Sequence, residues 1–366
     1  MIPSLVYLLP LYPLAVQAAL EVDLNSTESI KRAAAQVAED LLTYYHGDEP
    51  GQIPGILPGP PPGGGDYYWW EGGAMWGALL DYWHWTGDGT YNNLSYQALL
   101  WQAGPNRDFV DKNWSFSLGN DDQAFWAMSA LIAAETKFED PPPDQPQWLA
   151  LAQAAFVAIA NGCFFNMGAR LARYTKNDTY LDWSIRTWDW LVAVKYIDDD
   201  WNVYDGADIS NNCTIIVKQQ FSYNAAILLQ GAAYLYNYTS DQIWLDRING
   251  LLDGIERVFF VKGVAYEPAC EGGCGFHWTS GKFDGLLGAG QQMDVLGALS
   301  SLLIMDAPVA VTNDTGGTSV GNPDAGAEKP TYSELGPITM GDRAGAGIVT
   351  VVAISLAITS LWWMIK

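Results

Sequence analysis

The sequence predicts an all-α protein whose helical hairpins close into an α/α toroid. Apolar residues recur with helical spacing along almost the whole 366-residue chain, whereas the alternating pattern of strands is nearly absent. A short joint also recurs between helices: an aromatic residue and a Thr end one helix, and the next begins on an aromatic residue. The alternative is a set of ordinary helix caps that look alike by chance. The clear copies are Trp85-Thr86-Gly87-Asp88 before Tyr91, Tyr174-Thr175-Lys176-Asn177 before Tyr180, and Tyr238-Thr239-Ser240-Asp241 before Trp244.

The same periodicity predicts ten helices, separated by loops that are rich in turn-forming residues. Notable loops of this kind lie at 50–66 and 140–146, and a rougher copy of the joint runs from Thr136 to Trp148. The predicted helices cover residues 27–46, 70–85, 92–103, 120–137, 146–160, 163–175, 179–196, 220–237, 241–258 and 288–304.

The pattern of the first residues predicts a targeting segment. An apolar run from Ile2 to Leu14 is short, is broken by prolines and is followed by small residues up to Ala18. These features favour a secretory signal peptide over residues 1–18, with a buried first helix as the alternative. The folded domain is then expected over residues 19–305.

The last residues are expected to attach the protein to a membrane. A polar stretch rich in Pro and Gly suggests a stalk over 306–343, and an apolar tail follows over 344–366. The tail is long enough to span a bilayer, and it also fits a GPI-attachment signal that is removed. Both interpretations predict a secreted protein held at the plasma membrane and cell wall.

Sequons and cysteines agree with secretion. Four cysteines (Cys163, Cys213, Cys270 and Cys274) are expected to form two disulfides, with three possible connectivities. The Asn-x-Ser/Thr sites, expected to carry glycans, are Asn25, Asn93, Asn113, Asn177, Asn212, Asn237 and Asn313.

Composition excludes several classes of partner. A formal net charge of −23 repels nucleic acid and suits an uncharged or basic substrate. The three histidines (His46, His84 and His277) are scattered, so no metal site and no cofactor are expected.

An aromatic stretch precedes and opens the second predicted helix. Glycines and an alanine follow the paired tryptophans, which lets another group approach closely. Sugar rings stack on indoles and bind carboxylates through their hydroxyls, so the stretch is interpreted as a sugar-binding wall, and a tryptophan-rich core is the alternative. The candidate residues are Tyr68, Trp69, Trp70, Glu71 and Trp76.

Two adjacent acids, Asp121 and Asp122, stand where a loop enters an apolar helix. Neighbouring residues inside a helix point about 100° apart, but at a helix start both can lean toward one ligand. Simple N-capping is the alternative explanation, although one carboxylate would suffice for it. Asn120, Gln123 and Trp126 around the pair are candidates for substrate binding.

A third cluster joins a loop to the start of another helix. Tyr204 and Asp205 lie in the loop, and Tyr223 and Asn224 open the helix. They are candidates for binding sugar hydroxyls, with plain turns and caps as the alternative. The run 198–200 of three aspartates is interpreted as a solvated loop without a role.

Together these strings resemble glycoside hydrolase family 76, in particular fungal cell-wall mannan endo-1,6-α-mannosidases. The resemblance implies an (α/α)6 barrel and a retaining mechanism, with Asp121 as nucleophile and Asp122 as acid/base. It implies action on α-1,6-mannan or GPI-glycan mannose, by hydrolysis or by transglycosylation. The strings include Tyr68-Trp69-Trp70-Glu71-Gly72-Gly73-Ala74-Met75-Trp76, Gly119-Asn120-Asp121-Asp122-Gln123-Ala124-Phe125-Trp126, Asn161-Gly162-Cys163-Phe164-Phe165-Asn166, Tyr204-Asp205-Gly206 and Phe221-Ser222-Tyr223-Asn224.

The chain also departs from that family's pattern. A loop that normally lies before Asn161 is missing, and so is a helical segment between Cys270 and Cys274. The count of ten helices rather than twelve fits these losses. They leave open a second function, a non-catalytic mannan-binding protein of the cell surface.

Overall fold

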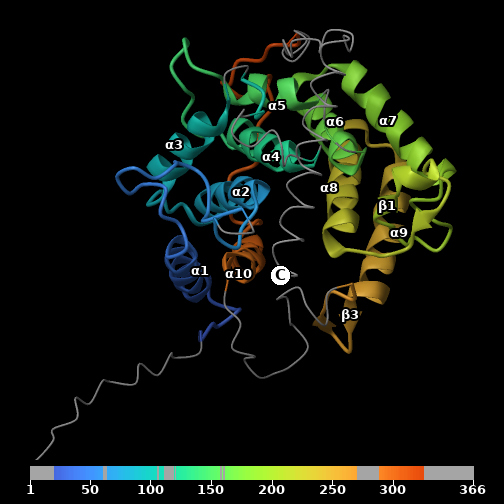
Figure 1. Cartoon of the computed structure of the whole chain (residues 1–366), viewed down its shortest axis with the longest axis horizontal. Coiled ribbons are helices and arrows are strands. Elements are labelled where there is room, and N and C mark those ends of the chain that lie inside the picture. Colours follow the sequence, from blue (N-terminus) through green and yellow to red (C-terminus); the bar gives the residue numbers. More distant parts are fainter. Residues whose placement is uncertain are drawn as a thin grey trace, which may run out of the picture. The chain divides into compact units, whose positions relative to one another are not determined.

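The structure is a computed structural model, and it describes residues 20–60, 64–104, 107–110, 119, 121–156, 159, 161–269 and 288–324. All of them lie within one compact unit, Met1–Ala325. Ten α-helices account for most of the described chain (Figure 1). They are α1 Thr27–Leu42, α2 Trp69–Thr86, α3 Asn92–Gln102, α4 Asp122–Glu135, α5 Trp148–Phe156, α6 Asn161–Thr175, α7 Asp178–Ala193, α8 Ser222–Thr239, α9 Gln242–Phe259 and α10 Ala289–Ser301.

The prediction of a helical protein is confirmed, and each predicted helix overlaps one of these elements. Strand structure in the described residues is limited to two short antiparallel pairs and one isolated bridge. The pairs are β1 Gly206–Ala207 with β2 Ile216–Val217, and β3 Phe260–Val261 with β4 Val264–Ala265.

The joints between helices share one geometry, which explains why their sequence repeats. The Thr hydroxyl donates to the carbonyl four residues earlier at 2.6–2.8 Å, and the next residue has a positive φ that ends the helix. Shared bonds of this kind argue against a chance resemblance of helix caps. The threonines are Thr86, Thr136, Thr175 and Thr239, and the residues after them are Gly87, Lys137, Lys176 and Ser240.

Contacts between helices give two layers. The helices α10, α2, α4, α6 and α8 pack on one another in that order and form the inner layer. The helices α1, α3, α5, α7 and α9 pack on α10, α2, α4, α6 and α8 respectively and form the outer layer (Figure 1). Within the described residues α8 and α10 do not pack extensively on each other, and residues 270–287 between them lie outside the description.

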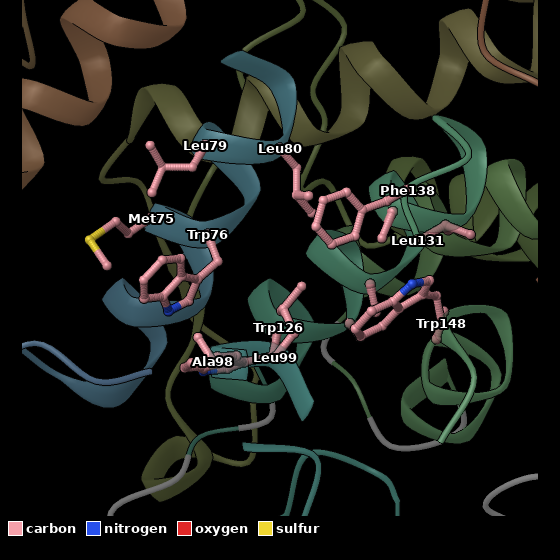
Figure 2. Packing of buried hydrophobic residues seen from close by; sticks show 14 of the residues in the cluster. Met75, Trp76, Leu79, Leu80, Ala98, Leu99, Trp126, Leu131, Phe138 and Trp148 are labelled. Atoms are coloured by element: carbon pink, nitrogen blue, oxygen red, sulfur yellow. The ribbon is translucent and has the colours of Figure 1, made fainter. Parts of the chain in front are cut away.

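Aromatic side chains fill the space between the helices. Trp76, Trp126 and Trp148 are fully buried in one large cluster (Figure 2). Helices α2 and α4 can approach closely because α2 has glycine where Trp126 packs, since a Cβ on Gly73 would lie 2.8 Å from the indole. A second cluster, centred on Phe165, Trp188 and Trp244, joins the later helices.

The domain boundary expected at residue 305 is too early for the described part of the chain. The Val311 N–H donates to the carbonyl of Glu135 at 2.7 Å, and Ser319 Oγ accepts from the Leu149 N–H at 3.0 Å. Residues 308–324, named the C-terminal strap below, therefore pack on the body although their composition resembles a stalk. Hydrogen bonds to exposed helix ends outweigh the lack of apolar residues here.

Several sequence-based expectations lie outside the described residues, namely the signal peptide, the tail over 344–366, Cys270, Cys274, Asn113 and Asn120. In the described part no helix is long and apolar enough to cross a membrane. Cys163 and Cys213 are both free, so the prediction of disulfides is wrong for these two cysteines. The other six sequon asparagines are all exposed.

Candidate active site

A pocket of about 420 Å³ lies where the inner helices α4, α6 and α8 begin. Asp121 enters it from the start of α4, and the segment after α7 forms the opposite wall. The described residues around the pocket include no Lys or Arg. They are Asp121, Asn161, Gly162, Cys163, Leu191, Tyr196, Ile197, Val203, Tyr204, Asp205, Gly206, Ala207, Tyr223, Asn224, Ile227 and Leu228.

Asp121 and Asp122 turn their carboxylates toward one place. A Cβ built on Gly119 would lie 2.9 Å from Asp122 Oδ2 and closer still to Asp121 Oδ1. The two oxygens are therefore less than about 6 Å apart, a range that includes the roughly 5–5.5 Å of a retaining pair. Glycine is needed at 119 because any side chain would occupy the space between the acids.

The geometry also tests the N-capping alternative. Asp121 is the N-cap residue of α4, but its side chain makes no capping hydrogen bond and its backbone has helical φ and ψ. Asp122 Oδ2 instead accepts from the Gly119 N–H, outside the helix, at 2.6 Å. Capping therefore does not explain two acids in a row.

The two acids differ in their surroundings. Burial raises the pKa of Asp122, the Gly119 N–H opposes this shift, and the neighbouring charge of Asp121 adds to it. Asp121 also affects a neighbouring residue of the pocket. Burial and the charge of Asp121 together raise the pKa of Cys163 to about 12. A half-buried acid with a raised pKa beside a more exposed acid is an arrangement suited to acid/base chemistry.

The predicted third cluster does come together in the pocket. Asn224 Nδ2 donates to Asp205 Oδ1 at 3.1 Å, which joins the start of α8 to the loop after α7. Burial and the nearby charges of Asp205 and Asp121 raise the pKa of Tyr223 to about 12. Asp205 and Asn224 place carboxylate and amide groups where they can bind uncharged hydroxyls.

The prediction of substrate binding is wrong for two members of the aromatic wall and for Trp126 beside the acid pair. Trp69, Trp76 and Trp126 are at most 5% exposed and so belong to the core. Their indole N–H groups donate to Gln102 Oε1, the Gly55 carbonyl and the Trp69 carbonyl respectively. A tryptophan-rich core, the alternative interpretation, is the better description because these N–H groups are satisfied inside the protein.

The remaining candidates in this region are less buried. Tyr68 is 51% exposed, and its N–H donates to Glu71 Oε2 at 2.6 Å, which caps α2. Trp70 is partly exposed and packs against Phe125 at 4.7 Å between ring centroids. Gln123 is buried. None of these four sequence-predicted residues lines the pocket.

Sequence reasoning missed part of the pocket. Tyr196, Ile197 and Val203 line it, and so do Asn161 and Cys163 at the start of α6. The string Asn161-Gly162-Cys163 carried a signal, since it forms part of the family resemblance. Tyr196 and Val203 carried none, because their burial depends on a turn that periodicity does not predict. No group of His, Cys, Asp or Glu in the described residues could hold a metal ion.

Two converging carboxylates, of which Asp121 lines a pocket of a two-layered helical fold, are the arrangement of a glycoside hydrolase. The family model named "Glycosyl hydrolase family 76" matches residues 29–160 and 157–273. The chain belongs to this family and has its (α/α)6-barrel fold.

Known relatives agree. Mannan endo-1,6-α-mannosidase DCW1 of Saccharomyces cerevisiae is 35% identical, and the alignment covers 94% of this chain and 95% of that protein. The crystal structure of Dfg5 from Chaetomium thermophilum in complex with glucosamine is 42% identical and has a TM-score of 0.80, covering 85% of this chain and 98% of that one. A solved structure of an inactive α-1,6-mannanase variant of Salegentibacter, in complex with α-1,6-mannotetrose, is 17% identical and has a TM-score of 0.53. The match covers 64% of this chain and 73% of that chain, and it supports the fold alone.

The comparisons also show that this chain is shorter than a relative. The family model matches in two parts, which overlap at 157–160. The alignment with the S. cerevisiae relative runs over 433 positions, more than the 366 residues of this chain, so that relative carries segments that this chain lacks.

Proposed function

We propose that this protein is a retaining mannosidase or mannosyl transglycosylase that acts on α-1,6-linked mannose of fungal cell-wall mannan or of a GPI glycan. The observation that carries the proposal is the convergence of the Asp121 and Asp122 carboxylates around Gly119. The names of the fungal relatives support the substrate class. A pocket lined by Asp, Asn and Tyr and free of Lys and Arg among its described residues suits an uncharged sugar.

The different environments of Asp121 and Asp122 assign them different roles in the reaction. Asp121 is the nucleophile: its carboxylate attacks the anomeric carbon and forms a glycosyl ester. Asp122 is the acid, and it gives its proton to the leaving oxygen as the glycosidic bond breaks. It then takes a proton from water or from an acceptor hydroxyl that attacks the ester. The raised pKa of Asp122 favours the protonated form that the first step needs.

The direct test is turnover of α-1,6-mannotetraose by the Asp121→Asn and Asp122→Asn variants. Each is expected to lower kcat/KM by about 10³-fold or more. The matched control is Asp199→Asn, which changes an exposed aspartate outside the pocket. This variant is expected to leave kcat/KM unchanged. Full turnover by both site variants would disprove the catalytic assignment.

Azide separates the two roles. With an activated mannosyl donor, Asp122→Ala plus azide gives the α-mannosyl azide, because the intermediate still forms. Asp121→Ala plus azide gives the β-azide, because azide replaces the nucleophile directly. Reversed products would exchange the assignments.

The second candidate function is a mannan-binding surface protein without catalysis. The segments that the S. cerevisiae relative carries and this chain lacks favour it, because the loss of part of the barrel could leave binding without catalysis. Binding of α-1,6-mannotetraose without any turnover by the wild-type protein would establish this alternative.

We further propose that the protein is a secreted glycoprotein, held at the cell surface by the tail over 344–366. The exposed sequons Asn25, Asn93, Asn177, Asn212 and Asn237, together with Asn313, support glycosylation. Release of the protein from cells by phosphatidylinositol-specific phospholipase C would support the GPI form of the anchor. Resistance to the phospholipase would favour a retained membrane helix.

A further inference from the structure

The three aspartates at 198–200, interpreted from the sequence as a solvated loop, include a residue that organises the pocket wall. Asp198 lies in the turn that follows α7, between Ile197 and Val203, which form an isolated antiparallel bridge. Residues 196–204 are named the wall turn below. Tyr196, Ile197, Val203 and Tyr204 of this turn all line the pocket.

Asp198 accepts hydrogen bonds with both carboxylate oxygens. Oδ1 accepts from the N–H groups of Asp200 and Asn202 at 3.0 and 2.9 Å. Oδ2 accepts from Asn202 Nδ2 at 2.9 Å and from the Tyr204 hydroxyl at 2.7 Å. One oxygen therefore fixes the backbone of the turn, and the other fixes a side chain of the pocket wall.

The wall turn is also attached to α9 behind it. Trp201 packs against α9 where that helix carries Gly250 and Gly254, since a Cβ at either position would overlap Trp201. Arg257 Nη2 donates to the Asp200 carbonyl at 2.6 Å and to Asn202 Oδ1 at 3.0 Å. These contacts fix the wall turn on α9, while four of its residues line the pocket.

The hydrogen bonds reach the candidate binding groups. Tyr204 lines the pocket. Its hydroxyl donates to Asp198, and Lys218 Nζ lies 5.6 Å from its ring centroid. Asp205 follows directly and receives the hydrogen bond of Asn224. The Asp205 N–H also donates to the Gln219 carbonyl at 2.9 Å, so Asp205 is held between the wall turn and the segment that precedes α8.

We propose that Asp198 is a positioning residue of the active site, which holds Tyr204 and Asp205 against the sugar that occupies the pocket. This inference rests on the proposed glycosidase function. A turn that serves only the fold would need the Oδ1 bonds to the backbone. The Oδ2 bond to the Tyr204 hydroxyl fixes, in addition, a side chain that lines the pocket.

The carboxylate of Asp198 is suited to hold this arrangement in acid. Burial alone would raise its pKa, but the hydrogen bonds from Asn202, Tyr204 and the Asp200 amide prevail and lower the pKa to about 2. Because the folded pKa is depressed, the arrangement is present above the unfolded value and is lost only as the pH falls toward 2. The hydrogen bonds of Asp198 in the wall turn should therefore persist in mildly acidic solution.

The test uses Asp198→Asn, which keeps one acceptor oxygen for the backbone of the turn and replaces the oxygen that binds Tyr204. On α-1,6-mannotetraose, KM is expected to rise about 10-fold while kcat changes less than about 3-fold, because uniform binding is lost. Tyr204→Phe should have the same effect, and the double variant should lose no more than either single one. Asp199→Asn is the matched control and leaves both constants unchanged.

A readout independent of turnover separates this inference from the proposed function. In Asp198→Ala the amides of Asp200 and Asn202 should exchange hydrogen at least about 10-fold faster, with unchanged exchange in α4. If the wild-type enzyme has no turnover, the proposed function fails, and the inference is judged by mannotetraose affinity, which Asp198→Asn must weaken. The inference is overturned if Asp198→Asn matches Asp199→Asn, if the losses of Asp198→Asn and Tyr204→Phe add, or if exchange is unchanged.

Discussion

The two ends of the inner helices use charge in opposite ways. Where α4 and α6 end, Arg170 Nη2 lies 2.6 Å from Glu135 Oε2, and both side chains are 2% exposed. Tyr234 of α8 donates to the same Glu135 oxygen at 3.3 Å, and its ring lies 5.5 Å from the Arg170 guanidinium. This end of the inner layer is paired, hydrogen-bonded and covered by the C-terminal strap.

At the other end, where the same helices begin, the acids have no cation among the described pocket residues. Asp121 and Asp122 lean toward the same space, and Asp205 also lines the pocket. The charge of Asp121 adds to the effect of burial that raises the pKa of Asp122. The difference shows that one set of helices separates the residues that hold the fold from those available for chemistry.

The largest expected effect comes from breaking the paired end. Arg170→Ala leaves the buried Glu135 without its partner and should destabilise the protein by about 3–5 kcal/mol, measured by urea denaturation. The double variant Arg170→Met, Glu135→Leu removes both charges and should be clearly more stable than Arg170→Ala. If the two variants are equally unstable, the packing rather than the ion pair governs this end.

The next effect belongs to the unpaired end. Gly119→Ala places a methyl group 2.9 Å from Asp122 Oδ2 and even nearer to Asp121 Oδ1. The carboxylates must move apart, so kcat/KM should fall about 10²-fold with little change in stability. Gly297→Ala on α10 meets open space and serves as the control. Unchanged activity of Gly119→Ala would contradict the convergence of the two acids.

The fold could be predicted from sequence because the signals are local and repeated. Each joint ends a helix through a Thr hydroxyl and a residue with positive φ. The residues around Thr86 or Thr175 are therefore enough to predict where that helix ends. The strap could not be predicted, because Ser319 binds Leu149 170 residues away. Composition describes such a segment as a stalk until its distant partners are known.

The site was predictable in part for the same reason. Asp121 and Asp122 are adjacent in the chain, so their proximity needs no tertiary knowledge. The direction in which a tryptophan side chain points cannot be predicted without the tertiary structure. Trp69 and Trp126 stack on each other in the core, with 5.1 Å between their ring centroids. The role of Asp198 was missed because a charge run usually marks a solvated surface, whereas here a turn gathers donors around one member.

A smaller effect tests how the paired end depends on pH. Burial raises the pKa of Asp81 to about 7, Arg170 opposes this shift, and Glu135 adds to it. Because the folded pKa is raised, the stabilisation by protonated Asp81 is present below the unfolded pKa and is lost as the pH rises through 7. Asp81→Asn should therefore gain roughly 1–3 kcal/mol relative to wild type between pH 5 and pH 8. A difference that stays constant over this range would contradict the assignment.

The smallest effect concerns the strap, and it decides whether the two ends are independent. Ser319 Oγ accepts from the buried Leu149 N–H in the first turn of α5, so it caps that helix from outside. Ser319→Ala should cost about 1 kcal/mol in urea denaturation, while the exposed neighbour Thr318→Ala should cost less. Since Ser319 does not line the pocket, kcat/KM should be unchanged. A fall in kcat/KM at full folding would mean that the strap also positions the acids at the opposite end.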